Sequence, residues 1–272
     1  MIGQKHILEW VNKNVDSFPH FIVVVGPRGS GKRTLVNEIA NKISCVYTQC
    51  EPLVDTVREV IDSSYNSQTK VMYCFADADN MKPQAKNAML KITEEPPENA
   101  YFCLTINDDS SLLGTIKSRA YVLTMENYSR DELKEYYYRS VSDDDNREAE
   151  VNLFCAICSN PGEIDMLTSY GKEFYDYVNL VADNIANVEP ANAFKSSSKL
   201  ALKSDEGYDL RLFLRCFMLI CEEHIMSNDA DSKKFSRGII VTAKAYNAAG
   251  KMGVNKQQLY DKWVFDIRGE WV

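Results

Sequence analysis

The feature that most constrains the fold is the segment Gly-Pro-Arg-Gly-Ser-Gly-Lys-Arg-Thr at residues 26–34. It follows Phe21–Val25, an apolar run with β-branched side chains at four of five positions, which is typical of a strand buried on both faces of a parallel sheet. Apolar residues then recur at helical spacing between Thr34 and Ile43. A strand, a glycine-rich loop and a helix in this order predict a phosphate-binding loop, because loop amides and a helix N-terminus surround phosphate groups.

One residue of this loop departs from the usual pattern. Lys32 stands where the lysine of such loops reaches the β- and γ-phosphates, but Arg33 replaces the Ser or Thr that ligates Mg²⁺. A guanidinium group has donors and no acceptor, so it cannot ligate a metal, although it can contact phosphate directly. The hydroxyl of Thr34 points about 100° away from the required direction. The residues that we expect to contact a nucleotide, with ATP as the candidate, are Gly26, Pro27, Arg28, Gly29, Ser30, Gly31, Lys32, Arg33 and Thr34.

The composition excludes several classes of protein. The chain has 272 residues, 45% hydrophobic and 26% charged, which are ordinary values for a globular protein of two or three small domains. It shows no signal segment and no apolar run of membrane-spanning length, so we expect a soluble cytoplasmic protein with no membrane partner. Its three histidines lie near no plausible nucleophile, which argues against a Ser-His hydrolase. The net charge of −8 includes no basic block for binding nucleic acid by electrostatics alone.

The eight cysteines lie mostly in apolar stretches, which favours the reduced thiols of a cytosolic protein. Cys155 and Cys158 have the spacing of two zinc ligands, but no second Cys or His pair accompanies them. They also lie in a helix-like run, so we interpret them as core residues and expect no zinc.

The alternation of strand-like and helix-like segments predicts an α/β domain with a five-stranded parallel sheet, followed by helices. The expected strands are residues 21–25, 45–48, 71–75, 101–106 and 121–124, and the intervening helices are 34–43, 54–63 and 83–93. Ser129-Arg-Asp-Glu132 is a capping box that opens the helical part, where later helices are expected at 210–225, 233–249 and 256–267.

An acidic segment after the expected strand Val71–Phe75 is the candidate for the second half of a nucleotide site. Hydrolysis of a nucleotide uses one carboxylate to organise Mg²⁺ and another to polarise water. The sequence here reads Ala76-Asp77-Ala78-Asp79. Taken alone, this segment fits an ordinary acidic loop at a strand end equally well.

The neighbouring motifs identify a family. Ala78–Met81, Gln84–Lys91 and Glu94–Asn99, in this order and spacing, resemble the clamp-loader ATPases of bacterial DNA polymerase III, and Leu112–Arg119 resembles the segment that ends in their Ser-Arg-Cys motif. The gamma and delta prime subunits are the members that the chain resembles. The resemblance implies three domains: an AAA+ nucleotide-binding core at 1–125, a small helical lid at 126–170, and an all-α collar at 171–272 that assembles subunits into a ring.

The resemblance also implies roles for individual residues. Arg119 matches the arginine finger that acts on ATP held by a neighbouring subunit, although Ala120 replaces the cysteine of the motif. Asn107 aligns with a polar sensor of the γ-phosphate, and Asp77 aligns with the catalytic acid, where it would be a residual acid. Ala76 stands at the aspartate that organises Mg²⁺, so a bound metal is doubtful.

Two further features of the sequence depart from the family, one residue and one missing insertion. Glu163 stands near the place of a second sensor arginine, where a carboxylate would repel phosphate. The zinc-binding insertion common in the family is missing, since only Cys45 and Cys50 lie in that part of the chain.

Three hypotheses follow for the function, and the first is preferred. The chain is a delta prime-like subunit that scaffolds the ring and donates Arg119, with weak or absent ATP hydrolysis of its own. Alternatively it is an active gamma-type ATPase motor, or a stand-alone AAA+ nucleotide-sensing or DNA-repair adaptor. The expected partners under the first two hypotheses are other clamp-loader subunits and, through the assembly, a sliding clamp and primer-template DNA. The sequence does not distinguish a bacterial from a phage origin.

Overall fold

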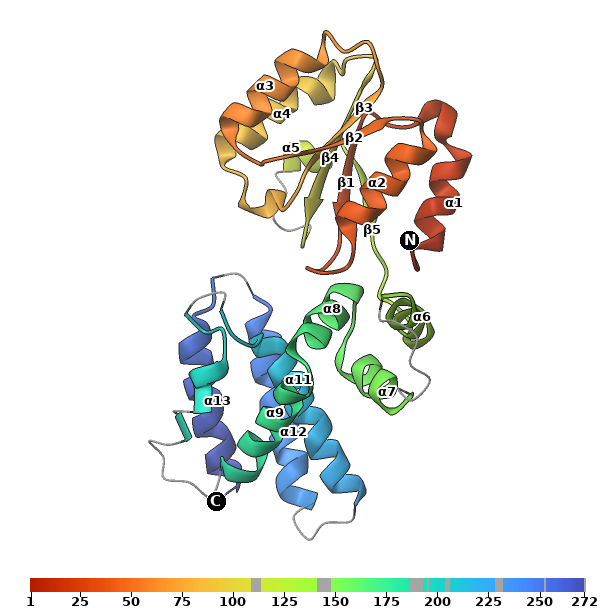
Figure 1. Cartoon of the computed structure of the whole chain (residues 1–272). Helices are drawn as coiled ribbons and strands as arrows, with labels where there is room; N and C mark the ends of the chain where they lie inside the picture. Colours follow the sequence, from red (N-terminus) through yellow and green to blue (C-terminus); the bar gives the residue numbers. More distant parts are fainter. Residues whose placement is uncertain are drawn as a thin grey trace. The chain divides into compact units, whose positions relative to one another are not determined.

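The computed structural model describes residues 1–108, 114–140, 148–185, 193–194, 196–203, 206–227, 232–251 and 253–271. The chain divides into two compact units. The first consists of Met1–Arg139 with Asn160–Gly162, and the second of Ser140–Ser159 with Glu163–Val272. Figure 1 shows that the first unit contains the sheet and that the second is built from helices. The division into three domains remains a prediction.

The sheet of the first unit has five parallel strands in the order β2-β3-β4-β1-β5. The strands are β1 (Phe21–Val25), β2 (Val46–Cys50), β3 (Val71–Phe75), β4 (Ala100–Ile106) and β5 (Tyr121–Thr124). Every residue of β1 and β4 is buried, as expected for inner strands covered on both faces, whereas most of the edge strand β2 is exposed. The strand that precedes the glycine-rich loop therefore lies inside the sheet, between β4 and β5.

Helices cover both faces of this sheet (Figure 1). Side chains alternate along the strands, so that Ile22 and Val24 pack with one group of helices and Val23 with the other. The first group is α1 (Lys5–Lys13) and α2 (Lys32–Lys42), and the second is α3 (Val54–Ser64), α4 (Pro83–Glu94) and the short α5 (Gly114–Lys117). The two apolar layers hold the strands in place, including the carboxyl ends of β1, β3 and β4, where the candidate site lies.

The predicted capping box forms at the start of α6 (Arg130–Ser140). The N–H and hydroxyl groups of Ser129 donate to Glu132 Oε2 at 2.8 and 2.9 Å, and the N–H of Glu132 donates back to Ser129 Oγ at 3.2 Å. These bonds satisfy donors that would otherwise be unpaired at the start of the helix.

The second unit packs its helices around an aromatic core. The helices are α7 (Glu148–Ile157), α8 (Pro161–Tyr170), α9 (Lys172–Asn184), α11 (Leu210–Met226), α12 (Ser232–Ala249) and α13 (Lys256–Trp271). Trp263 meets Phe213 and Phe217 edge to face, with ring centroids 5.5 and 4.9 Å apart. Its indole N–H donates to Thr242 Oγ1 at 3.0 Å, and both side chains are buried.

All eight cysteines are free and buried.

Three strands, at 21–25, 71–75 and 121–124, have the bounds expected from the sequence. The second strand begins one residue later than expected and spans 46–50. Here Ser44 adopts a left-handed conformation (φ 59°), and the N–H of Cys45 still donates to Ala40 O at the end of α2. Within the described ranges, no helix combines the length and the apolar character needed to cross a bilayer.

We predict that Thr242→Val destabilises the second unit by about 1–3 kcal/mol, because valine keeps the shape of threonine but leaves the buried indole N–H of Trp263 without its acceptor. Urea unfolding followed by circular dichroism measures the change, with Thr168→Val, at an exposed position of α8, as the matched control. Equal stability of the two variants would contradict a contribution from this hydrogen bond.

Candidate nucleotide site

The glycine-rich loop leaves the carboxyl end of β1 and enters α2. Gly29 and Gly31 have φ values of 83° and 84°, in the left-handed region that side chains disfavour. Gly26 is required for a different reason, since a Cβ there would lie 2.9 Å from Ser30 Oγ. The loop thus has the close backbone packing expected of a phosphate-binding loop, and α2 begins directly after Gly31.

Lys32 is held at the centre of the loop. Its ammonium group donates to the carbonyls of Gly26 and Pro27 at 2.7 and 3.0 Å and to Asn107 Oδ1 at 3.0 Å. The side chain is only 7% exposed, and this burial lowers the pKa of Lys32, while Asp77 and Asp79 act in the opposite direction. The three ammonium protons therefore have three oxygen acceptors, any of which a phosphate oxygen could replace.

Asn107, which directly follows β4, is oriented by Asp79. The backbone N–H of Asn107 donates to both carboxylate oxygens at 3.0 and 2.9 Å, and its side-chain Nδ2 donates to Oδ2 at 2.8 Å. With its amide nitrogen engaged in this way, the amide oxygen faces Lys32. Asp79 belongs to the acidic segment singled out in the sequence, but its contact with Asn107 is set by the pairing of β3 with β4, which brings the carboxyl ends of these parallel strands to one edge of the sheet.

Arg33 and Asp77 form an ion pair beside the loop. Arg33 Nη2 lies 2.7 Å from Asp77 Oδ2, and the two side chains are 53% and 48% exposed. Asp77, the second residue after β3, has a left-handed backbone (φ 53°), and its N–H donates to Thr105 Oγ1 at 3.2 Å. An exposed pair of this kind adds at most about 1 kcal/mol to stability. The pair matters mainly because it places a guanidinium group beside the loop and engages the carboxylate of Asp77.

These residues do not fit the Mg²⁺ that nucleotides usually carry. Mg²⁺ requires oxygen ligands in near-octahedral geometry, whereas Arg33 offers only donors and the buried Ala76 offers a methyl group. Asp77 already accepts a hydrogen bond from Arg33, and Thr34 lies exposed on the first turn of α2. In the described ranges there is no cluster of three His, Cys, Asp or Glu residues that could hold a metal ion.

The outer side of the loop is held by residues that the sequence did not reveal. Tyr128 donates its hydroxyl hydrogen to Ser30 O at 2.7 Å, and burial raises the pKa of Tyr128 to about 12. The N–H of Gly162 donates to Gly29 O at 2.9 Å. A Cβ on Gly29 would lie 2.5 Å from Asn160 Oδ1, so glycine is needed for this approach as well. Ser30 itself is buried, whereas Pro27 and Arg28 are exposed.

Arg119 lies on the exposed side of the turn that follows α5. Its Nη1 donates to Thr115 O at 3.1 Å and its Nη2 donates to Glu94 Oε1, also at 3.1 Å. The side chain is 39% exposed, and Glu94 is 61% exposed. Arg119 is thus fixed at the surface by the end of α4. Leu112 and Leu113, which open its predicted motif, lie outside the described residues.

Glu163 has partners within the second unit. Ser159 donates to its Oε2 through the backbone N–H at 2.7 Å and through the hydroxyl at 2.9 Å, and Arg215 Nη1 lies 3.1 Å from the same oxygen. The predicted negative charge at this position is therefore offset by the guanidinium group of Arg215.

Sequence comparisons connect the chain with replication proteins. The family model described as the delta subunit of DNA polymerase III matches residues 48–129. The delta prime subunit of Haemophilus influenzae is 28% identical over 176 residues, which cover 53% of this chain and 52% of that protein. The gamma subunit of Buchnera aphidicola from Schizaphis graminum is 26% identical over 152 residues, covering 44% of this chain and 42% of the relative. The chain therefore spans about half the length of the curated relatives that it matches, or less.

Solved structures extend the likeness in fold to nearly the whole chain. A gamma subunit-related protein of DNA polymerase III from Thermotoga maritima aligns with a TM-score of 0.51 at 16% identity, covering 97% of this chain and 99% of that one. The RuvB Holliday junction branch migration motor of the same organism aligns with a TM-score of 0.52 at 17% identity, covering 84% of this chain and 77% of that one. At these identities the structures show the fold alone. The chain has an AAA+ fold, and part of its sequence is similar to the delta prime and gamma subunits of DNA polymerase III.

Proposed function

We propose that the chain is a delta prime-like subunit of a cytoplasmic clamp loader of the DNA polymerase III type. In this role it helps to hold the ring of subunits together and presents Arg119 to a nucleotide bound by its neighbour, while hydrolysing little or no ATP itself. The observation that carries the proposal is the contrast between two arginines. Arg119 lies at the surface in a weak, exposed pair with Glu94, whereas Arg33 is paired with Asp77, the carboxylate that aligns with the catalytic acid of the family.

The surroundings of Arg119 suit action on a neighbouring subunit. A guanidinium group stabilises the charge that develops on a transferring phosphate because it is permanently charged and offers a planar fork of donors. Here Glu94 and the carbonyl of Thr115 hold the fork at the surface. A phosphate approaching from another subunit would compete with Glu94 for Nη2, and the loss of an exposed ion pair would cost little.

The chain's own site supports weak hydrolysis. Catalysis of phosphoryl transfer depends on metal ions that neutralise the developing charge and on a group that orients the attacking water. Ala76 provides no ligand, and the aligned acid, Asp77, is bonded to Arg33. The residues that bind phosphate are thus retained while those that organise hydrolysis are replaced or occupied.

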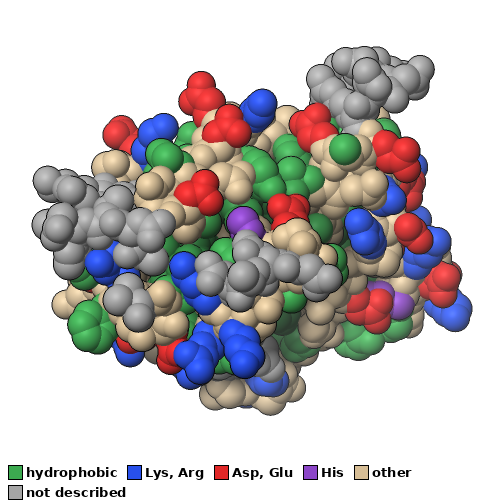
Figure 2. All heavy atoms as spheres, turned by 90° about the horizontal axis from the view of Figure 1, so that it is seen from below, with side chains coloured by type: hydrophobic (Ala, Val, Ile, Leu, Met, Phe, Trp, Pro, Cys, Tyr) green, Lys and Arg blue, Asp and Glu red, His purple; other side chains and the backbone are tan. Residues whose placement is uncertain are grey.

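DNA and the sliding clamp are proposed as partners of the assembled ring rather than of this chain alone. Figure 2 shows acidic and basic side chains interspersed among apolar ones on the face that it presents, without a broad region of one sign. The net charge of −8 points the same way, since contact with a phosphate backbone relies on clustered Lys and Arg. We therefore propose that contact with primer-template DNA is made by the assembled ring.

The alternative role, an active gamma-type motor, is favoured by one observation. Lys32, Asn107 and Asp79 form a complete hydrogen-bonded network at the loop, which a subunit without any use for nucleotide would not need to keep. The two roles differ in whether Lys32 of this chain contributes to turnover by the ring.

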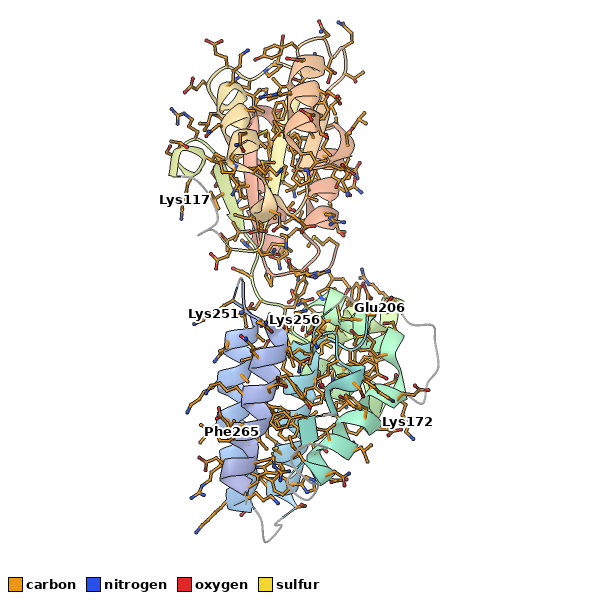
Figure 3. The ribbon with its side chains drawn as sticks, turned by 90° about the vertical axis from the view of Figure 1, so that its left-hand side faces the viewer. Lys117, Lys172, Glu206, Lys251, Lys256 and Phe265 are labelled. Carbon is orange, nitrogen blue, oxygen red and sulfur yellow. The ribbon has the colours of Figure 1, made fainter. Side chains whose placement is uncertain are left out.

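We predict that Arg119→Ala in an assembled ring abolishes most of the turnover at the one site that Arg119 faces, because arginine fingers contribute about 10³–10⁵-fold to catalysis. DNA-stimulated phosphate release by the ring measures the loss. The matched control is Lys117→Ala, which removes an exposed cation from the adjacent helix α5 (Figure 3). A normal rate for the Arg119 variant would contradict the proposed role.

We predict that Lys32→Ala, introduced into this chain alone, leaves the phosphate-release rate of the ring nearly unchanged, because the chain contributes little hydrolysis of its own. The same assay tests this, with gel filtration to confirm that the ring assembles. A fall in rate as large as that caused by the Arg119 variant would favour the gamma-type motor instead.

A further inference from the structure

The loop keeps its phosphate-binding geometry although the ligands for Mg²⁺ are missing, and these two facts require a common explanation. A nucleoside triphosphate carries several negative charges, which a divalent cation usually offsets in such sites. Here Arg33 stands in place of the hydroxyl ligand and Ala76 in place of the carboxylate. A site that binds phosphate without a metal needs another source of positive charge.

Arg33 supplies a cation at this place. It is the second residue of α2, directly after Lys32, and its guanidinium group is held 2.7 Å from Asp77, the carboxylate that follows β3. A guanidinium group has five N–H donors, and the bond to Asp77 uses one of them. The remaining donors, on a side chain that is 53% exposed, are available to a ligand at the loop.

The charges around Lys32 are consistent with this arrangement. Arg28, Lys32 and Arg33 provide three positive charges, and Asp77 and Asp79 provide two negative ones. The pKa of Lys32 is lowered by burial first, raised by the two carboxylates, and lowered again by the two arginines, so all four groups act on the ammonium. The local balance of +1 (three positive minus two negative) favours an anion before any metal is added.

We propose that the loop binds a nucleoside di- or triphosphate without a metal ion, and that Arg33 is the built-in counter-cation of the phosphates. Asp77 then serves as the anchor of Arg33 rather than as a catalytic acid. Its left-handed backbone and its bond to Thr105 hold the carboxylate at the end of β3, where it keeps the guanidinium beside the loop. The bound nucleotide acts as a structural ligand, which stabilises the folded chain by mass action.

This inference rests on the proposed binding of nucleotide by the loop, and it is tested on the full chain without its partners. The experiment titrates the chain with fluorescent ADP and ATP analogues, once with excess Mg²⁺ and once with EDTA. The dissociation constants in the two conditions are expected to agree within about threefold. Lys32→Ala should abolish binding in both conditions, because it removes the cation at the centre of the loop.

Substitutions at the counter-cation provide the sharper test. Arg33→Thr should weaken binding in EDTA by about tenfold or more, because it removes charge-assisted hydrogen bonds to phosphate. Arg58→Thr, which removes one positive charge from an exposed position of α3, is the matched control and should leave binding unchanged. The double variant Arg33→Thr, Ala76→Asp restores a hydroxyl and a carboxylate as metal ligands, so its binding should become dependent on Mg²⁺.

Each result separates this inference from the function proposed above. Binding by the natural chain that requires Mg²⁺ would overturn the inference and strengthen the gamma-type alternative. Binding in neither condition would overturn it too, but would leave the role of Arg119 intact, since that role needs nucleotide only on the neighbour. The double variant could fail to fold, because a carboxylate at position 76 would be buried. In that case the single variant Arg33→Thr tests the inference by itself. If its affinity for the nucleotide analogues in EDTA equals that of the natural chain, the inference is overturned.

Discussion

The buried ammonium group of Lys32 is the interaction on which the site depends. It joins the loop after β1 to Asn107 after β4, two neighbouring inner strands, through three hydrogen bonds. A buried cation is costly unless its donors find oxygen acceptors, so the loop carbonyls and the amide oxygen of Asn107 stabilise the ammonium group in this position. Asp79 completes this arrangement because it fixes the amide of Asn107.

The two halves of the candidate nucleotide site therefore differ. The loop half has the glycines, the lysine and the oriented amide that suit phosphate binding. In the half that would organise hydrolysis, Arg33 and Asp77 form an ion pair. This combination suits a subunit that hydrolyses little ATP itself and presents Arg119 to a neighbouring subunit, which is the role proposed above.

Much of the fold was predictable because uninterrupted apolar runs mark the inner strands; β1 and β3 have the bounds that the sequence indicates. Helix α1 is not marked by a start signal in the sequence, since Gln4 at its start has a left-handed backbone and its side chain makes no capping bond to the helix. In the site, two residues that the sequence singles out, Lys32 and Asn107, are joined by a hydrogen bond, and their roles toward a nucleotide stay predictions. The Arg33–Asp77 pair was not foreseen, because it joins residues 44 positions apart whose side chains meet only after strand order and backbone direction are fixed.

The burial of all eight cysteines has a practical consequence for work on the assembly. Thiol reagents act on the exposed thiolate, and burial raises the pKa of Cys45 and Cys50 to about 11 and that of Cys216 and Cys221 to about 12. A hydrogen bond with Cys103 lowers the pKa of Cys74, but the side chain of Cys74 is fully buried. The natural chain should thus react only slowly with maleimide dyes. A single cysteine added at the surface would carry the label alone, so that distances between neighbouring subunits become measurable without first removing any native cysteine.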